Sequence, residues 1–134
     1  MAPTGPFPLR TFPVHLGAGA TVTVLEEFTG DGAWYERYGA QVASDGVEGR
    51  LVSLHTFDEP WGSWEVHPHG EELVLCTAGT ITLHQEDGDG VRTVVLHAGE
   101  AVVNPPGVWH TADVEGTATV VFITAGLGTE NRDR

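Results

Sequence analysis

Histidine and glutamate side chains cluster in one stretch of the chain, residues 64–79, WEVHPHGEELVLCTAG. Two histidines and two glutamates fall within its segment 67–72. A second stretch, residues 99–110, GEAVVNPPGVWH, ends a β-like run in a Pro-Pro-Gly turn followed by His110. Imidazole and carboxylate groups together are ligands that divalent transition metals take. The two stretches therefore predict a metal pocket, provided that the fold brings them together.

Strand alternation leaves a second interpretation of the first stretch open. Trp64 and Val66 share one face of the expected strand SWEVH, and Glu65 and His67 share the other. If the apolar face alone points into the core, the polar pair is solvated and carries no function. A metal site also requires the first stretch to meet His110 across the fold, which sequence spacing does not establish.

The elements that must position these residues are short strands. From residue 50 onward, runs rich in β-formers alternate with turns of Gly, Pro, Asp and Glu at intervals of about ten residues. The DGDG segment at 87–90 is a strong hairpin signal. We expect strands at 50–57, 63–67, 72–77, 80–86, 91–97, 101–104, 108–114 and 118–124. This series indicates an all-β sandwich or barrel.

The segments outside this series carry weaker signals. Residues 1–20 form an extended N-terminal arm, because prolines crowd residues 1–13, although 14–20 and 21–25 could be short strands. Residues 33–43, AWYERYGAQVA, fit one helical turn or a strand equally well. The C-terminal tail, 125–134, is expected to be unstructured at its end. Together the segments form one domain, 1–134, with a core barrel at 50–124.

Composition excludes several classes of function. The net charge of −13 repels phosphate backbones and anionic lipid, so we expect neither a nucleic-acid partner nor a membrane partner. No run approaches the ~20 apolar residues of a membrane span. Cys76 is the one cysteine, so an internal disulfide is impossible. The first residues lack the order of a secretory signal, and a cytoplasmic protein is expected.

The two stretches resemble the two motifs of the cupin superfamily. The second motif of that family runs Gly-x5-Pro-x-Gly-x2-His, which here is Gly99, Pro105, Gly107 and His110. In the first motif a glutamate is followed by six residues and a glycine, as in the segment 72–79. The asparagine that usually lies four residues after the second-motif histidine is absent, and Val114 occupies that position. The resemblance implies a single-domain cupin, a double-stranded β-helix or jelly-roll barrel.

The His-x-His pair of the first motif allows two assignments. His67 and His69 match it literally, but then Glu72 follows one residue too early, and Pro68 lies between two ligands on a paired strand. We prefer the register in which His67 is the second histidine and Glu65 takes the first position. The spacing to Glu72 is then allowed, and strand alternation puts residues 65 and 67 on one face.

The preferred register implies a metal site of His67, Glu72 and His110. Glu65 is then a fourth ligand or, together with Glu72, a catalytic carboxylate. Such a set resembles the facial arrangement that leaves open positions on Fe, Mn, Ni or Zn. Under this register His69 is a solvated loop residue at the rim, and Glu71 faces outward.

By resemblance, the protein is an enzyme that acts on a small organic molecule by dioxygenation, decarboxylation, isomerisation or polyketide cyclisation. The alternatives are a non-catalytic metal- or ligand-binding sensor and a cupin whose pocket no longer binds metal. Single-domain cupins are often homodimers, and we expect the contact on the outer face of strand 63–67. Packing or a dimer contact is the expected role of Trp61, Trp64 and Trp109, and an aromatic wall for a planar substrate is the alternative.

The remaining candidate residues have simpler interpretations. Cys76 is expected to point into the barrel as a small buried residue. His55 could line the pocket, although a surface or hydrogen-bonded role is favoured. His84 is expected to face solvent, and His15 and His97 lie beside turns without a nameable partner.

Overall fold

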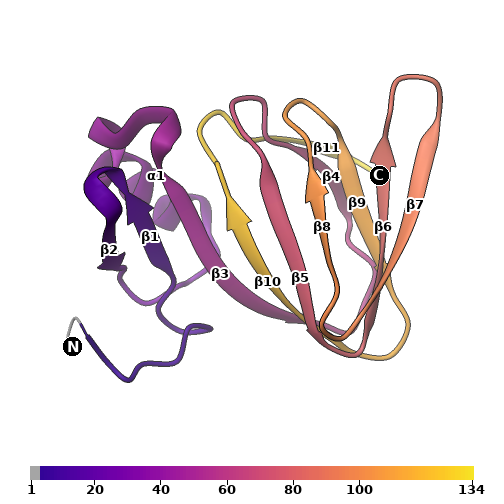
Figure 1. The fold of residues 1–134 in the computed structure, drawn as a ribbon, viewed down its shortest axis with the longest axis horizontal. Helices are drawn as coiled ribbons and strands as arrows, with labels where there is room; N and C mark the ends of the chain where they lie inside the picture. Colours follow the sequence, from indigo (N-terminus) through magenta and orange to yellow (C-terminus); the bar gives the residue numbers. More distant parts are fainter. Residues whose placement is uncertain (1–3) are drawn as a thin grey trace.

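Two antiparallel β-sheets face each other in the computed structural model, which describes residues 4–134. A smaller lobe formed by the N-terminal elements lies at one side of this barrel (Figure 1). The six-stranded sheet has the order β2-β1-β3-β10-β5-β8, and the five-stranded sheet has the order β11-β4-β9-β6-β7. The strands are β1 (Val14–Gly17), β2 (Thr21–Val24), β3 (Arg50–Phe57), β4 (Ser63–Val66), β5 (Glu72–Ala78), β6 (Thr80–Glu86), β7 (Val91–His97), β8 (Ala101–Asn104), β9 (His110–Val114), β10 (Ala118–Thr124) and β11 (Glu130–Asp133).

Successive strands from β3 to β10 mostly alternate between the two sheets, as in a jelly-roll barrel or double-stranded β-helix. The expected all-β jelly-roll class is therefore confirmed. The buried core lies between the sheets and is built from alternate residues of β5, β6, β9 and β10. Cys76 is fully buried in this core, as predicted.

The strands between residues 50 and 124 match the sequence expectations closely. β3, β6, β7, β8 and β10 have the expected bounds, while β9 begins two residues later than expected, at His110. The C-terminal tail differs, because Glu130–Asp133 form strand β11 instead of an unstructured end. β11 pairs antiparallel with β4, with Arg132 opposite Trp64. Its polar residues extend the five-stranded sheet without adding to the core.

The N-terminal segments add to the barrel. Residues 1–3 of the expected arm lie outside the described residues. Strands β1 and β2 form where the glycine-broken runs predicted them, and β1 pairs with β3, so the arm extends the six-stranded sheet. Short 3-10 segments, η1 (Ala18–Ala20) and η2 (Ala43–Glu48), complete the lobe. No helix in the described part of the chain is long and apolar enough to span a membrane.

The ambiguous segment at 33–43 forms helix α1 (Gly32–Gln41). Asp31 caps its N-terminus, because the carboxylate accepts a hydrogen bond of 2.9 Å from the backbone N–H of Trp34. Trp34 is fully buried and stacks on Tyr38. Within the lobe, buried His15 of β1 holds the helical segments, because its ring nitrogens lie 2.7 Å from the Tyr38 hydroxyl and 2.7 Å from the Asp45 carboxylate. Tyr38 and Asp45 are therefore the partners of His15 that the sequence did not identify.

Candidate metal centre

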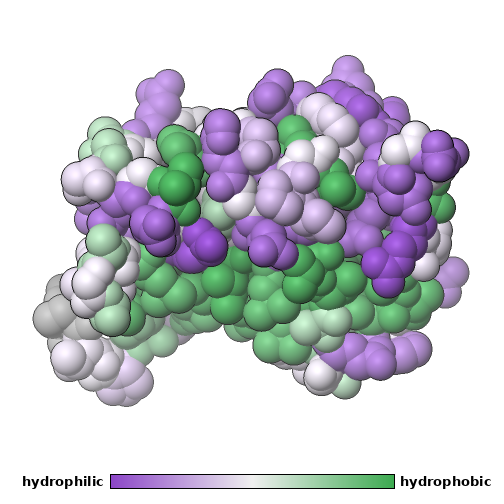
Figure 2. Space-filling view, turned by 45° about the horizontal axis from the view of Figure 1, so that its top comes forward, coloured by the Kyte–Doolittle hydropathy of each residue, from purple (hydrophilic) through white to green (hydrophobic). Residues whose placement is uncertain are grey.

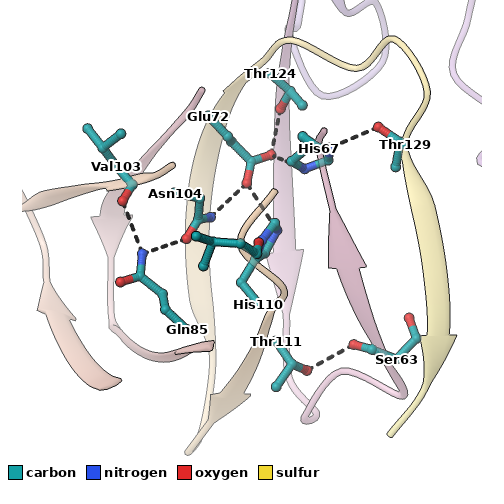
Figure 3. Close-up of polar contacts among 11 residues, drawn as sticks. Ser63, His67, Glu72, Gln85, Val103, Asn104, His110, Thr111, Thr124 and Thr129 are labelled. Carbon is teal, nitrogen blue, oxygen red and sulfur yellow. Dashed lines mark hydrogen bonds and ion pairs between the residues drawn. The ribbon is translucent and has the colours of Figure 1, made fainter. Parts of the chain in front are cut away.

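The predicted ligands come from opposite sheets. His67 directly follows β4, and His110 begins β9, its neighbour in the five-stranded sheet. Glu72 begins β5 in the six-stranded sheet and points across the barrel toward both histidines (Figure 3). The loop of the second motif packs on the first motif, since the backbone N–H of Gly107 donates to the His67 carbonyl at 3.1 Å. The fold thus joins the two stretches that sequence spacing could not connect.

All three side chains are buried and in close contact. His67 Nε2 lies 3.2 Å from Glu72 Oε2, and His110 Nε2 lies 3.3 Å from Glu72 Oε1. Ligand atoms that sit ~2.1 Å from one ion at right angles to each other are ~3 Å apart. Each histidine therefore contacts a different oxygen of one carboxylate, at distances compatible with an ion pair or with ligands of a common ion.

Hydrogen bonds fix both imidazoles in the form that binds a metal. Thr129 donates its hydroxyl hydrogen to the Gly126 carbonyl, so it accepts from Nδ1 of His67, at 2.8 Å. Nδ1 of His110 lies 3.2 Å from the Val108 carbonyl, which can only accept. In both neutral rings the proton is therefore on Nδ1, and Nε2 presents a lone pair to Glu72.

The two Nε2 atoms are buried and have no hydrogen-bond partner among the described residues. A lone pair that faces a carboxylate oxygen is repelled, so this arrangement requires a positive charge between them, either a proton or a cation. Burial alone would raise the pKa of Glu72, but His110 and His67 reverse this and hold it well below its usual range. Burial alone would lower the pKa of His110, and Glu72 reverses that shift upward. These pKa shifts favour an ion pair between a protonated His110 and Glu72, and a divalent cation would supply the same positive charge to this donor set.

Further hydrogen bonds hold the Glu72 carboxylate in place. Asn104 Nδ2 donates to Oε1 at 2.9 Å, and Thr124 Oγ1 donates to Oε2 at 2.6 Å. Gln85 Nε2 in turn donates to Asn104 Oδ1 at 2.7 Å (Figure 3). The sequence analysis missed these residues. The register of β5 and β8, which places Asn104 directly opposite Glu72, is the signal that identifies the first of them.

Glu65 joins the histidines, whereas His69 does not. Glu65 pairs in register with His110, and one ligand atom from each of Glu65, His67 and His110 lies within 4.8 Å of the others. Burial, with Glu72 as a second cause, raises the pKa of Glu65. His69 is exposed in the following turn and is not part of this cluster. Glu71 is exposed as well.

A cavity of about 1030 Å³ adjoins the cluster and is lined by Glu65, His67 and Glu72. It extends toward α1. Six aromatic residues, Phe28, Tyr35, Tyr38, Phe57, Trp61 and Phe122, form part of its wall.

His55 also lines this cavity, so the favoured surface or hydrogen-bonded role was wrong. Its ring packs against those of Phe28, Phe57 and Phe122, and burial lowers its pKa.

The other candidate residues lie outside the cluster. His84 is partly exposed and is paired with Asp113 at 2.8 Å, with Thr93 on its other nitrogen. His97 is exposed, with Thr80 at 3.4 Å. Trp64 and Trp109 flank the Arg132 guanidinium, with ring centroids 5.2 and 4.5 Å from its central carbon.

Comparisons with known proteins agree with this architecture. An uncharacterized conserved protein with a double-stranded β-helix domain, from Klebsiella pneumoniae subsp. pneumoniae MGH 78578, superposes with a TM-score of 0.52 at 22% identity. The match covers 63% of this chain and 76% of that protein. Oxalate oxidase in complex with the substrate analogue glycolate gives a TM-score of 0.52 at 21% identity, over 60% of this chain and 45% of that one. These likenesses show the fold.

A search of curated proteins found no match. The family model for the cupin domain, Cupin_2, matches residues 55–126, which is more than half of the 134-residue chain. That segment contains both predicted motifs, the strands that face each other across the barrel, and the two histidines with their glutamates. The chain belongs to the cupin family.

Proposed function

We propose that this cupin binds a divalent transition metal through His67, His110 and Glu72, and acts on a small organic molecule in the adjoining cavity. One observation carries the proposal. Two buried Nε2 atoms, each held as a lone-pair donor by a hydrogen bond on Nδ1, face one carboxylate without a hydrogen-bond partner among the described residues. Folded proteins rarely leave buried polar atoms unpaired, and an ion bound between these nitrogens and Glu72 would pair them. Fe, Mn, Ni and Zn all suit this donor set.

The carboxylates have different proposed roles. Both Glu72 oxygens already accept hydrogen bonds, from Asn104 and Thr124, so Glu72 is oriented for a fixed role beside the histidines. Glu65 lines the cavity, and its raised pKa, caused mainly by burial, favours a carboxyl group that can take up and release a proton. We therefore assign proton transfer to Glu65, or the completion of the metal's ligand set. A bound metal would act as a Lewis acid toward a substrate oxygen.

The cavity supports substrate binding beside this centre. Its aromatic wall offers rigid apolar surface, and its metal end offers the polar groups that fix orientation. The candidate reactions are those of related cupin enzymes: dioxygenation, decarboxylation, isomerisation and cyclisation. The same cavity could hold a ligand without turnover, which makes a sensor the second candidate. Turnover of candidate substrates in air and under argon separates these functions.

Elemental analysis of protein purified without a metal-affinity tag tests the metal site. We expect about one transition-metal ion per chain in the wild type. His110→Ala removes one of two nitrogen donors, so occupancy should fall by roughly tenfold or more. Unchanged metal content in His110→Ala would exclude the site.

His69→Ala is the matched control, because it removes the neighbouring histidine that the structure leaves exposed. This variant should retain the wild-type metal content. Loss of metal from it would show that the literal His67-Pro68-His69 pair is the ligand pair, and would reject the register that uses Glu65.

A further inference from the structure

One row of residues crosses the inner face of the six-stranded sheet and joins the metal centre to the N-terminal lobe. Glu72 of β5 lies opposite Thr124 of β10, and Thr124 lies opposite Leu51 of β3. Leu51 in turn lies opposite His15 of β1. Three steps of ~4.8 Å between neighbouring strands separate Glu72 from His15 by roughly 14 Å. All four residues line the same cavity, which therefore has a second polar end at His15.

The sheet has polar residues on the cavity side of this row and apolar residues on the other side. The chain neighbours of the row form an adjacent row that points away from the cavity and consists of Val14, Val52, Ile123 and Leu73. Figure 2 shows a continuous hydrophobic band along the molecule, where the front sheet of Figure 1 is turned toward the reader. Antiparallel sheets commonly show the opposite pattern, with the apolar face inside. The polar inner row therefore indicates contact with a ligand instead of core packing.

His15 connects two partners at this second end. The Asp45 carboxylate lies 2.7 Å from His15 Nε2 and accepts a hydrogen bond of 3.2 Å from the backbone N–H of Ala18. These two hydrogen bonds lower the pKa of Asp45, so the carboxylate is charged and can only accept. Nε2 of His15 therefore carries a hydrogen, and in the neutral ring Nδ1 accepts from the Tyr38 hydroxyl at 2.7 Å. The lone pairs of the Tyr38 oxygen are left for another partner.

Two glycines let the backbone pack directly on this chain of hydrogen bonds. A Cβ at Gly49 would lie 2.6 Å from Cε1 of His15, and a Cβ at Gly17 would lie 2.8 Å from an Asp45 carboxylate oxygen. Such close approach is open only to glycine while the two side chains stay in place. Burial, with Asp45 as a second cause, raises the pKa of Tyr38, so its phenol stays protonated near neutral pH. The second end thus presents a neutral hydroxyl in a fixed orientation.

We propose that the Tyr38 oxygen accepts a hydrogen bond from the far end of a ligand whose near end binds the metal. This inference rests on the proposed function, because the near end needs the metal centre. The ligand is then an elongated molecule with oxygen donors at one end, an aromatic or apolar body, and a hydroxyl or amino group at the other end. Its body packs on the aromatic part of the cavity wall. His15 and Asp45 are positioning residues, since they direct the Tyr38 hydrogen away from the ligand.

Titration calorimetry with three probes and added Zn²⁺ tests the proposal. 4′-Hydroxybiphenyl-4-carboxylate has a carboxylate for the metal, two rings in line and a hydroxyl group at the far end. Biphenyl-4-carboxylate lacks that hydroxyl, and 4′-methoxybiphenyl-4-carboxylate replaces it with a group that can only accept. The wild type should bind the hydroxylated probe roughly 3–10-fold more tightly than either of the others. Equal affinity for the methoxy and hydroxyl probes would contradict an accepting Tyr38 oxygen, and this measurement needs no variant.

Tyr38→Phe should abolish the preference for the hydroxylated probe and leave the Kd of biphenyl-4-carboxylate unchanged. The preference is a ratio of two dissociation constants for one variant, so a change in the folded fraction cancels. Tyr35→Phe is the matched control, because Tyr35 lies on the same helix and lines the same cavity. This control should keep the wild-type preference. The proposal is overturned if the wild type does not bind or prefer the hydroxylated probe, if Tyr38→Phe retains the preference, or if Tyr35→Phe loses it equally.

The same titrations after removal of metal by a chelator separate this contact from the metal centre. Loss of metal should weaken all three probes alike, because each carries the same carboxylate. Affinities that do not depend on Zn²⁺, together with a preference that depends on Tyr38, would contradict the proposed function and support the Tyr38 contact. Affinities that depend on Zn²⁺ without any hydroxyl preference would support the metal centre and overturn the Tyr38 contact.

Discussion

At the scale of single residues, one hydroxyl determines how His67 presents itself to the centre. Thr129 is committed as a donor to the Gly126 carbonyl and can only accept from His67 Nδ1. Since Thr129 lies 62 residues from His67 in sequence, this contact depends on the C-terminal segment being in place. Partners of this kind commonly determine the affinity of a metal-binding histidine.

Thr129→Val is isosteric and removes the acceptor for His67 Nδ1. We expect the affinity for added Zn²⁺ or Mn²⁺, measured by titration calorimetry, to fall by roughly 10–100-fold. Thr93→Val is the control, because it removes a similar threonine–histidine contact from His84 on the outside of the barrel. Equal affinities for the two variants would show that Thr129 does not position the ligand.

The proposed ligands could be predicted from sequence, but the residues that hold them could not. His67, Glu72 and His110 lie in family-like motifs with informative spacing. Asn104, Thr124 and Thr129 are ordinary polar residues at strand ends, and their roles depend on the pairing of strands far apart in the chain. Gln85 likewise supports Glu72 through Asn104.

At the scale of elements, the turn between β5 and β6 packs closely against the turn between β9 and β10. Gly79 in this turn has φ +74°, and a Cβ there would lie 2.0 Å from the Thr117 carbonyl oxygen. No side chain fits at that distance, so the turn depends on glycine for both its conformation and its close approach.

Gly79→Ala should destabilise the fold by more than about 3 kcal/mol, measured by urea unfolding. Gly116→Ala is the matched control, since Gly116 has φ +73° and open space around its Cβ position. It should lose only the ~1–2 kcal/mol of the left-handed conformation. Similar losses in both variants would mean that the backbone near Thr117 relaxes freely.

Strands with an alternating apolar pattern were predictable, whereas two other elements were not. β11 is polar and exposed throughout, so its conformation comes from pairing with β4 and not from its own pattern. Helix α1 buries only Trp34, which gives the sequence no helical stripe. Its clearest local signal is the Asp31 cap.

At the scale of the whole molecule, acidic residues far outnumber basic ones, which gives a net charge of −13. The printed sequence has six basic and nineteen acidic residues. Ion pairs of the three arginines Arg37, Arg132 and Arg134 are at or near the surface, where such pairs contribute little. Repulsion among the remaining carboxylates therefore opposes folding at neutral pH.

Salt should stabilise this protein. Raising NaCl from ~10 mM to ~200 mM at pH 7 shortens the screening length, and we expect the melting temperature to rise by a few degrees, on the order of 1 kcal/mol. Near the isoelectric point of about 4.6, the net charge vanishes and the gain should disappear. A melting temperature that falls with salt at pH 7 would mean that attractive pairs dominate.

The cavity and its proposed metal centre are built from two parts of the chain, one that matches the family model and one that flanks it. The segment that matches the family, residues 55–126, contains the proposed ligands. Tyr35 and Tyr38 of α1, which line the cavity, and Thr129, which orients His67, lie outside it. Mutations in these flanking segments can therefore alter which molecule fits, or how tightly the ion is held, while the ligands stay unchanged. Ligand specificity and metal affinity can therefore evolve through substitutions in the flanking segments.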